Sequence, residues 1–311
     1  MALPEEETGE SEGSRHAPLP PRPDRQAEVE ELRRKLRRLD APAARPAQQP
    51  ILYRRDLPHS GTRPAGPPAT VGRPVALQEA LGGIEVEAPH GGIAYLVAHR
   101  LEEWPRYQAL HDAFHERFGQ HQALLRHRLP EGCEGLSLEE VLLIDLETTG
   151  LSTSPLFLIG VLHWEDGRLV VRQYLARDYS EERATVSLIA EGLARKRLLV
   201  SFNGKSFDVP YLRMRAAANG IPLPEAPAHL DLLHECRRAW GHRLPDCKLQ
   251  TLERYVCRRV RHNDIPGAEI PDAYHAFVRT GNAAQLARIV EHNRWDLATL
   301  AELLVRLPGE E

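Results

Sequence analysis

The distribution of apolar and polar residues is most regular from residue 141 onward. Residues 141–144 form a short apolar run that is typical of a buried strand. Residues 156–162 and 169–175 predict two more strands, and the Glu-Asp-Gly sequence at 165–167 predicts a hairpin turn between them. Residues 198–202 are typical of a further strand. The first part of this region therefore favours an antiparallel hairpin followed by strands that are more widely spaced.

Helical patterns follow and separate these strands. Helices are predicted near residues 180–196, 208–219, 229–240 and 248–258, and a long helix is predicted at 283–307. A hairpin of strands followed by strands that alternate with helices indicates an α/β fold, with a mixed sheet flanked by helices. We expect this folded domain to span residues 136–308.

The first 75 residues have a different composition, because they hold 13 of the 25 prolines. Such a segment favours neither a continuous helix nor a central strand, so 1–75 is predicted to be a disordered, proline-rich N-terminal tail. A short helix is expected within it, at residues 26–39, with acidic residues first and basic residues last. Two interpretations of this helix stand: a docking element for a protein partner, or a helix that folds against its own chain.

Residues 76–135 form an extension whose structure the pattern leaves uncertain. A strand is predicted at 91–98 and a helical segment at 104–128. His111 and His115 lie four residues apart on the latter, which is a spacing that can bind a metal ion. The glutamate of an HExxH motif is missing, so a polar helix face is the favoured interpretation.

Composition narrows the class of protein only slightly. The hydrophobic fraction of 42% is ordinary for a globular chain, and no apolar run has the length needed to cross a bilayer. The N-terminus is acidic, which does not suit a secretory signal, so a cytoplasmic location without membrane attachment is expected. A net charge of −4 argues against non-specific binding of nucleic acid by bulk charge. The four cysteines form no CxxC pair and are expected to stay reduced.

Acidic residues gather at the ends of two predicted strands. Asp145 and Glu147 are two residues apart on one strand and point to the same side of it. Two close carboxylates after an apolar strand are unfavourable unless a cation neutralises them, and oxygen ligands suit Mg²⁺ or Mn²⁺. Asp208 falls in the first turn of a helix that follows the next strand, where it serves either as a cap or as a further ligand.

A third polar group lies in the last predicted helix. His292 and Asp296 are four residues apart and share one helix face. An isolated pair of this kind is most often a surface contact worth a few tenths of a kcal/mol. Its place after the two acidic strand ends gives the pair a second interpretation, as part of one site.

The order of these motifs resembles that of the DEDD exonuclease superfamily, whose members share the ribonuclease H-like fold. More narrowly, residues 140–307 are similar to the YprB-type ribonuclease H-like family. That narrower similarity is carried by four segments, Pro155-Leu156-Phe157-Leu158-Ile159-Gly160, Phe202-Asn203-Gly204-Lys205-Ser206-Phe207-Asp208-Val209-Pro210, Asp264-Ile265-Pro266-Gly267 and His292-Asn293-Arg294-Trp295-Asp296.

The resemblance implies that Asp145, Glu147, Asp208 and Asp296 are catalytic residues that hold two Mg²⁺ or Mn²⁺ ions. It also implies that His292 is the catalytic residue that activates water. One departure is visible, since members that use a histidine usually carry it five residues before the last aspartate. Glu291 occupies that position here, and His292 is four residues away.

The function that the resemblance implies is hydrolysis of phosphodiester bonds in DNA or RNA. The leading hypothesis is a 3′–5′ exonuclease that acts on a single-stranded end by a two-metal mechanism. A structure-specific endonuclease of the same fold and a non-catalytic nucleic-acid-binding module are the alternatives. Thr148, Asn203, Lys205 and Arg294 are candidate contacts to the substrate.

Overall fold

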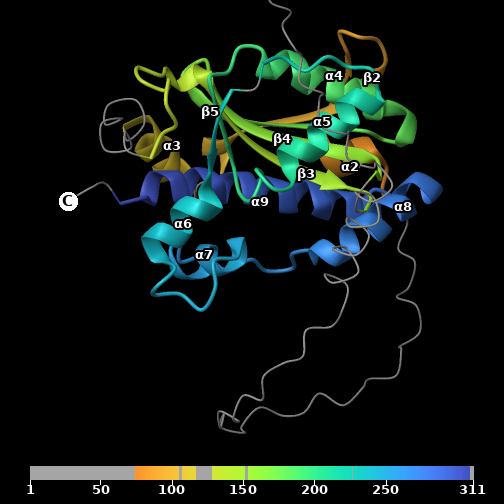
Figure 1. Ribbon diagram of the computed structural model, residues 1–311. Helices are drawn as coiled ribbons and strands as arrows, with labels where there is room; N and C mark the ends of the chain where they lie inside the picture. Colours follow the sequence, from red (N-terminus) through yellow and green to blue (C-terminus); the bar gives the residue numbers. More distant parts are fainter. Residues whose placement is uncertain (1–73, 105–106, 117–127, 151–152, 226, 309–311) are drawn as a thin grey trace, which may run out of the picture. The chain divides into compact units, whose positions relative to one another are not determined.

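The computed structural model of the protein describes residues 74–104, 107–116, 128–150, 153–225 and 227–308. Its centre is a seven-stranded sheet with the spatial order β1-β2-β5-β4-β3-β6-β7 (Figure 1). The strands are β1 (Ile84–Glu87), β2 (Ile93–Arg100), β3 (Val141–Thr148), β4 (Leu156–Glu165), β5 (Arg168–Leu175), β6 (Leu198–Ser201) and β7 (Ala228–Asp231).

Helices cover both faces of this sheet. They are α2 (Leu77–Leu81), α3 (Gln108–Phe114), α4 (Glu182–Leu193), α5 (Asp208–Ala218), α6 (Leu232–Trp240), α7 (Leu249–Tyr255), α8 (Ile270–Thr280) and α9 (Ala284–Arg306), with short 3-10 turns between several of them. The apolar sides of α4 and α5 meet one face of the sheet. The long helix α9 lies across the other face, with α6 and α7 on its far side (Figure 1).

The pairing of β3 decides where polar strand ends meet. β3 pairs antiparallel with β4 on one side and parallel with β6 on the other, and β6 pairs parallel with β7. Because the carboxyl ends of parallel strands lie at the same edge of a sheet, the residues after β3, β6 and β7 are brought together. The mixed α/β sheet predicted from the sequence is thus confirmed.

The elements expected from residue 141 onward are present, with one correction. The predicted hairpin is β4–β5, and Asp166 and Gly167 both have the positive φ angles of a tight hairpin turn. The helix expected at 229–240 is wrong in its first three residues, because 228–231 form β7 and the helix begins at Leu232. Pairing with β6 prevails there over the helical pattern of the sequence.

The extension before residue 136 contributes to the same sheet. β2 pairs antiparallel with β5, and β1 pairs antiparallel with β2. The predicted strand at 91–98 corresponds to β2, and the predicted helix at 104–128 contains α3. Residues 1–73 of the predicted proline-rich tail, including the helix proposed at 26–39, lie outside the described residues. No described helix has both the length and the apolarity that a transmembrane span requires.

Candidate active site

Strand β3 presents the first two carboxylates of the site. Asp145 and Glu147 alternate with the buried residues Ile144 and Leu146, so both acids point to the same side of the strand. Burial and the charges of Asp296, Glu147 and Asp208 raise the pKa of Asp145 well above its ordinary value. Burial also raises the pKa of Glu147 to about 8. These two carboxylates therefore lie in an environment that disfavours their charged forms.

The position of Asp145 depends on a close contact between α9 and β4. Asn293 Nδ2 donates a hydrogen bond to Asp145 Oδ2 (2.7 Å), and Asn293 Oδ1 accepts one from Gln173 Nε2 (2.8 Å). Gly160 lies directly opposite Asp145 in the β3–β4 register. A Cβ atom at position 160 would lie 1.9 Å from Asn293 Oδ1, so only glycine leaves room for this amide.

The turn after β6 presents the third carboxylate. Asp208 is the buried first residue of α5, and backbone N–H groups of Asp208 and Leu146 partly offset the effect of burial, which raises its pKa to about 7. Gly204 is close enough to Ser201 that a Cβ atom would meet Ser201 Oγ at 2.2 Å. The turn is thus packed tightly enough to fix the start of α5.

A buried acid at the end of β7 holds this turn in place. Asp231 accepts hydrogen bonds from the backbone N–H groups of Asn203 (2.8 Å) and Lys205 (3.0 Å). It also caps α6 by accepting from the N–H of Leu233 (3.0 Å). Asp231 therefore satisfies three backbone donors and positions Asp208 indirectly.

Helix α9 supplies the last acid and the histidine. His292 and Asp296 are nearly buried, with 11% and 14% of their side chains exposed, and His292 Nε2 lies 3.4 Å from Asp296 Oδ2. The other ring nitrogen of His292, Nδ1, lies 2.7 Å from Asp264 Oδ1. Asp264 thus fixes the ring so that Nε2 faces Asp296.

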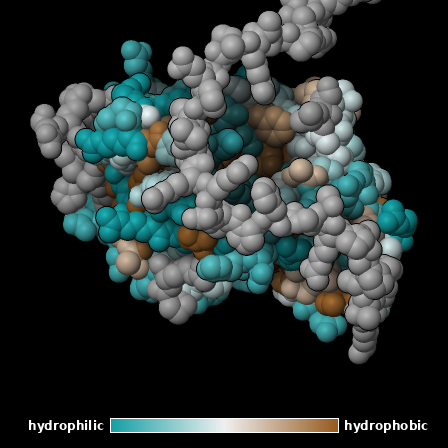
Figure 2. All heavy atoms as spheres, turned by 90° about the horizontal axis from the view of Figure 1, so that it is seen from below, coloured by the Kyte–Doolittle hydropathy of each residue, from teal (hydrophilic) through white to brown (hydrophobic). Residues whose placement is uncertain are grey.

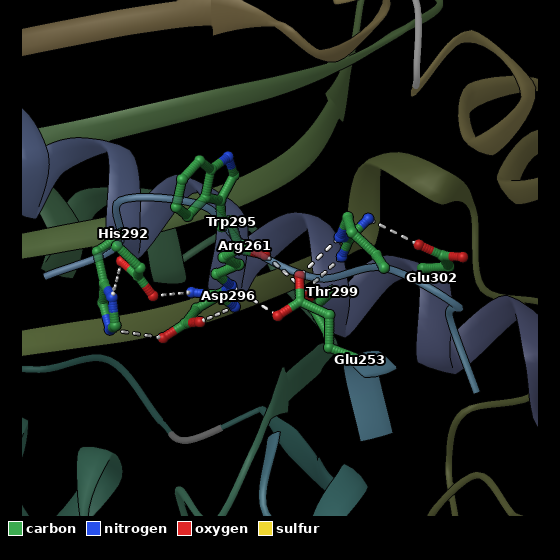
Figure 3. A network of polar contacts seen from close by, with 9 residues as sticks. Glu253, Arg261, His292, Trp295, Asp296, Thr299 and Glu302 are labelled. Carbon is green, nitrogen blue, oxygen red and sulfur yellow. Dashed lines mark hydrogen bonds and ion pairs between the residues drawn. The ribbon is translucent and has the colours of Figure 1, made fainter. Parts of the chain in front are cut away.

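Arg261 is the internal cation of the site. Its guanidinium donates to Asp296 Oδ1, to Glu253 Oε2 (2.6 Å) and to Asp264 Oδ2 (3.3 Å), as Figure 3 shows in part. Only 6% of the Arg261 side chain is exposed, so its charge is compensated by carboxylates instead of water. Glu253 in turn is bound by Arg259 (2.6 Å) and by Thr299 (3.2 Å), which extends the network along α9.

The structure brings four of the predicted site acids into one electrostatic group. The charges of Asp208 and Asp296 raise the pKa of both Asp145 and Glu147. Burial is the largest cause of the raised pKa of Asp296, and Arg261 and His292 act against it. The acids come from β3, α5 and α9, which are far apart in the chain.

The donor set fits a divalent cation in its chemistry. Four buried or half-buried carboxylates with raised pKa values are a group of oxygen ligands that a hard cation would neutralise. Within the described part of the chain, no three acidic, histidine or cysteine side chains converge tightly enough to hold one ion. In this arrangement Asp296 is directed to Arg261 and His292, and Asp145 to Asn293. Coordination would therefore require these side chains to turn.

The candidate substrate contacts occupy different surroundings. Thr148 Oγ1 donates to the carbonyl of Gly150 (2.7 Å) at the end of β3, and the side chains of Asn203 and Lys205 are exposed beside Asp208.

Arg294 instead lies over the ring of Trp104, with 4.3 Å from its Cζ to the ring centroid, and contacts Glu291. It is two residues from both His292 and Asp296, about 200° around the helix from either. The structure does not bring Arg294 to the carboxylates.

Among the residues that the structure describes, the paired histidines of the extension belong to no group that could hold a metal ion. His111 and His115 both stack on Trp164, with ring centroids 5.1 and 5.3 Å apart from it. This contact is consistent with the polar helix face that the sequence favoured.

Four residues with clear roles in the geometry received no role from the sequence, namely Arg261, Asp264, Asn293 and Asp231. Asp264 belongs to the Asp-Ile-Pro-Gly segment, and Asn293 follows His292, so both lie in motifs that carried the family resemblance. For Asp264 and Asn293, their place in these motifs was therefore the signal by which the sequence could have identified them. Arg261 and Asp231 had no comparable signal, because their partners lie 35 and 28 residues away.

Comparison with known proteins identifies the family to which this fold belongs. Residues 142–308, more than half of the chain, match the model of the ribonuclease H family RNase_H_2, and the chain belongs to this superfamily. It is also 31% identical over 193 residues to the uncharacterized protein YprB of Bacillus subtilis (strain 168). That match covers 60% of this chain and 46% of YprB, so the chain spans about half the length of this curated relative.

Among solved structures, the chain is similar to the family B DNA polymerase of the hyperthermophilic archaeon Pyrobaculum calidifontis. The match has a TM-score of 0.42 and 20% sequence identity, and it covers 52% of this chain and 24% of the polymerase.

The carboxylate group predicts that the metal-free protein loses stability as the pH rises above about 6.5. Glu147 and Asp208 have pKa values near 8 and 7, so the folded state holds protons that the unfolded state releases. The raised pKa of His292 acts in the same direction. His163 and His229, with pKa values lowered to about 4, act oppositely, mainly between pH 4 and the unfolded-state pKa of about 6.5, and this effect fades above that pH. We expect the free energy of unfolding to fall by about 2 kcal/mol between pH 6.5 and 8.

Urea unfolding in EDTA at several pH values measures this slope. The Asp208→Asn variant serves as the control, because it removes one titrating group and should flatten the dependence. Saturating Mn²⁺ at pH 8 should restore about 2.7 kcal/mol at a concentration 100 times its dissociation constant. A free energy of unfolding that stays constant or increases from pH 6.5 to 8 in EDTA would contradict the prediction.

Proposed function

We propose that the protein is a metal-dependent nuclease that hydrolyses phosphodiester bonds, acting as a 3′–5′ exonuclease on single-stranded ends of DNA or RNA. The observation that carries the proposal is the group formed by Asp145, Glu147, Asp208 and Asp296, four acids with raised pKa values on three separate elements. Groups that keep several buried carboxylates together against their mutual repulsion are characteristic of functional sites.

The four carboxylates are the proposed ligands of two Mg²⁺ or Mn²⁺ ions. Bound there, divalent cations would supply a lowered pKa for an attacking water and positive charge opposite the phosphate oxygens. The remaining tasks belong to the protein. Asn293 orients Asp145, Asp231 anchors the turn that carries Asp208, and Arg261 compensates the charge of Asp296.

His292 is the proposed proton acceptor of the reaction. Asp264 binds Nδ1, so Nε2 is the nitrogen directed toward the carboxylates and the one that would accept a proton from water. Burial lowers the pKa of the ring, but the hydrogen bond to Asp264 and the charges of Asp296 and Glu147 raise it overall. Asp264 is therefore a positioning residue, since it acts through His292.

A hydrolysis assay with Mn²⁺ on single-stranded, duplex and hybrid substrates tests the proposal, with Asp208→Asn as the inactive control. End-labelled and internally labelled strands separate the two modes of cleavage. Release of mononucleotides from the 3′ end supports the exonuclease, and short internal fragments would instead support an endonuclease. Wild-type protein that cleaves none of these substrates, or an Asp208→Asn variant that cleaves as fast as wild type, refutes the proposal.

Replacement of Asp264 by Asn is expected to lower kcat by about 10- to 100-fold and to leave KM within about twofold. The amide keeps the shape of the side chain but removes the negative charge. That charge favours the protonated form of the His292 ring and fixes its orientation. Steady-state kinetics on a short single strand measure both constants.

Asp246→Asn is the matched control, because Asp246 lies in the loop before α7 and is 42% exposed. It should leave both constants unchanged. Equal losses in the two variants, or a loss confined to KM in Asp264→Asn, would remove the positioning role from Asp264.

A further inference from the structure

A hollow lies directly beside the carboxylate group, on the side of α7. It has a volume of about 450 Å³ and is lined by Pro245, by residues of α7 and by residues of the segment that follows α7, up to Asp264. Arg261 and Asp264 belong to this lining, and they contact Asp296 and His292. We call this hollow the α7 groove. Two residues of its lining therefore also bind the acid and the histidine that α9 contributes to the candidate active site.

The segment around the α7 groove has a charge opposite to that of the whole chain. Residues 232–263 contain eight Lys and Arg residues and three Asp and Glu residues, for a net charge of +5, whereas the chain carries −4. Figure 2 views the protein from the side on which α6 and α7 lie in Figure 1, and its coloured surface is mostly hydrophilic.

The acids of this segment are bound by its own cations. Glu253 is only 2% exposed and is held by Arg259 and Arg261, Glu235 is held by Arg238, and Asp246 lies 3.8 Å from Lys248. Arg254 and Arg258 are exposed. Arg254 lines the groove, and Arg258 directly precedes the lining residue Arg259. The solvent-facing charge at the groove is thus positive, which favours an anionic ligand.

An exposed aromatic ring accompanies these charges. Tyr255 is 54% exposed, and the guanidinium of Arg254 lies 5.7 Å from the centre of its ring. Val260, which also lines the groove, is 60% exposed. Exposed aromatic rings beside basic side chains are the combination by which proteins bind single strands, because the rings stack on bases and the cations contact phosphates.

We propose that the α7 groove binds a single strand of nucleic acid and leads it to the carboxylates, with Arg254 and Arg258 on phosphates and Tyr255 stacked on a base. The inference rests on the proposed function, since it assigns the path of that function's substrate. The continuity of the groove with Arg261 and Asp264 gives the strand its direction. An acidic protein segment is the alternative ligand of the groove, but it has no bases that could stack on Tyr255.

Binding of fluorescein-labelled oligo(dT) and oligo(U), measured by anisotropy in EDTA, tests the groove without hydrolysis. The double variant Arg254→Ala with Arg258→Ala should bind about 25-fold more weakly at 0.1 M salt, and the slope of log affinity against log salt should decrease in magnitude by about 1.4. Tyr255→Ala should lose about tenfold with the salt slope unchanged, whereas Tyr255→Phe should bind like wild type. Arg195→Ala, an exposed residue after α4 on the opposite face of the sheet, is the control and should change nothing.

The possible outcomes of these assays bear separately on the groove and on the proposed function. A double variant with wild-type affinity and salt slope, or wild-type protein that binds no strand, overturns the groove. Tighter binding of a labelled poly-glutamate peptide than of the oligonucleotides overturns it in favour of an acidic protein partner. Strands that bind through Arg254 and Tyr255 but are not hydrolysed in Mn²⁺ support the groove and refute the proposed function. Hydrolysis by the wild type, together with wild-type affinity in the groove variants, supports the proposed function and refutes the groove.

Discussion

Replacement of Asp145 by Asn is expected to lower hydrolysis at least about 1000-fold and, in EDTA at pH 8, to stabilise the protein by about 1 kcal/mol. The activity falls because one of the four proposed ligands loses its charge. The stability increases because desolvation, together with the charges of Asp296, Glu147 and Asp208, raises the pKa of Asp145 and so disfavours its charged form. A functional residue that is unfavourable for folding produces these opposite effects, and a purely structural residue does not.

Hydrolysis of a labelled single strand in Mn²⁺ and urea unfolding in EDTA measure the two effects on the same preparation. Asp112→Asn is the matched control, because the Asp112 side chain is 69% exposed and distant from β3 in sequence. It should alter neither quantity. A variant Asp145→Asn that is less stable than wild type at pH 8, or that keeps its activity, would show that Asp145 does not belong to a strained ligand group.

Replacement of Gly160 by Ala is expected to reduce the free energy of unfolding by about 3 kcal/mol and the Tm by about 8 °C. The added Cβ would lie 1.9 Å from Asn293 Oδ1, so α9 or β4 must shift. Such a shift also breaks the hydrogen bond from Asn293 to Asp145. Hydrolysis should therefore fall by about 10- to 100-fold although residue 160 carries no chemical group.

Calorimetry and urea unfolding measure the loss of stability, and Gly192→Ala is the control. Gly192 lies within α4 with nothing near its Cβ direction, so alanine there should stabilise the helix by up to about 1 kcal/mol. Combining Gly160→Ala with Asn293→Ala should cost less than the sum of the two single changes, because the smaller side chain leaves room for the methyl group. Additive losses would mean that the contact between residues 160 and 293 does not determine how α9 docks.

The two proposals concern different parts of one site. The carboxylates and His292 define where a phosphodiester would react, and the α7 groove defines how a strand would reach them. Arg261 connects the two, since its guanidinium binds Asp296 and its side chain lines the groove. Because Arg261 is almost entirely surrounded by carboxylates, it is a structural cation and is not counted among the proposed phosphate contacts.

The sequence alone was sufficient for most of the strands and helices from residue 141 onward, although it gave no prediction for α8. The spacing of apolar residues and the turn-forming residues are local features of the sequence. They therefore predicted β3, the β4–β5 hairpin, α5 and α9 close to their observed bounds. Asp145, Glu147, Asp208 and Asp296 were recognisable because each stands in a motif at the end of a strand or on a helix face. Strand β7 was predicted as helix, because a four-residue strand in a helical pattern is decided by its neighbour β6.

Only the tertiary structure decided how these acids are held. Asp264 reaches His292 across 28 residues, Arg261 reaches Asp296 across 35, and Asn293 reaches Asp145 across 148. Such contacts leave no periodic trace in the chain, since they depend on how closely α9 docks on β4 and on the space left at Gly160. The residue types at the site were therefore readable from sequence. Their partners were not, because partner choice follows from packing between elements that are distant in the chain.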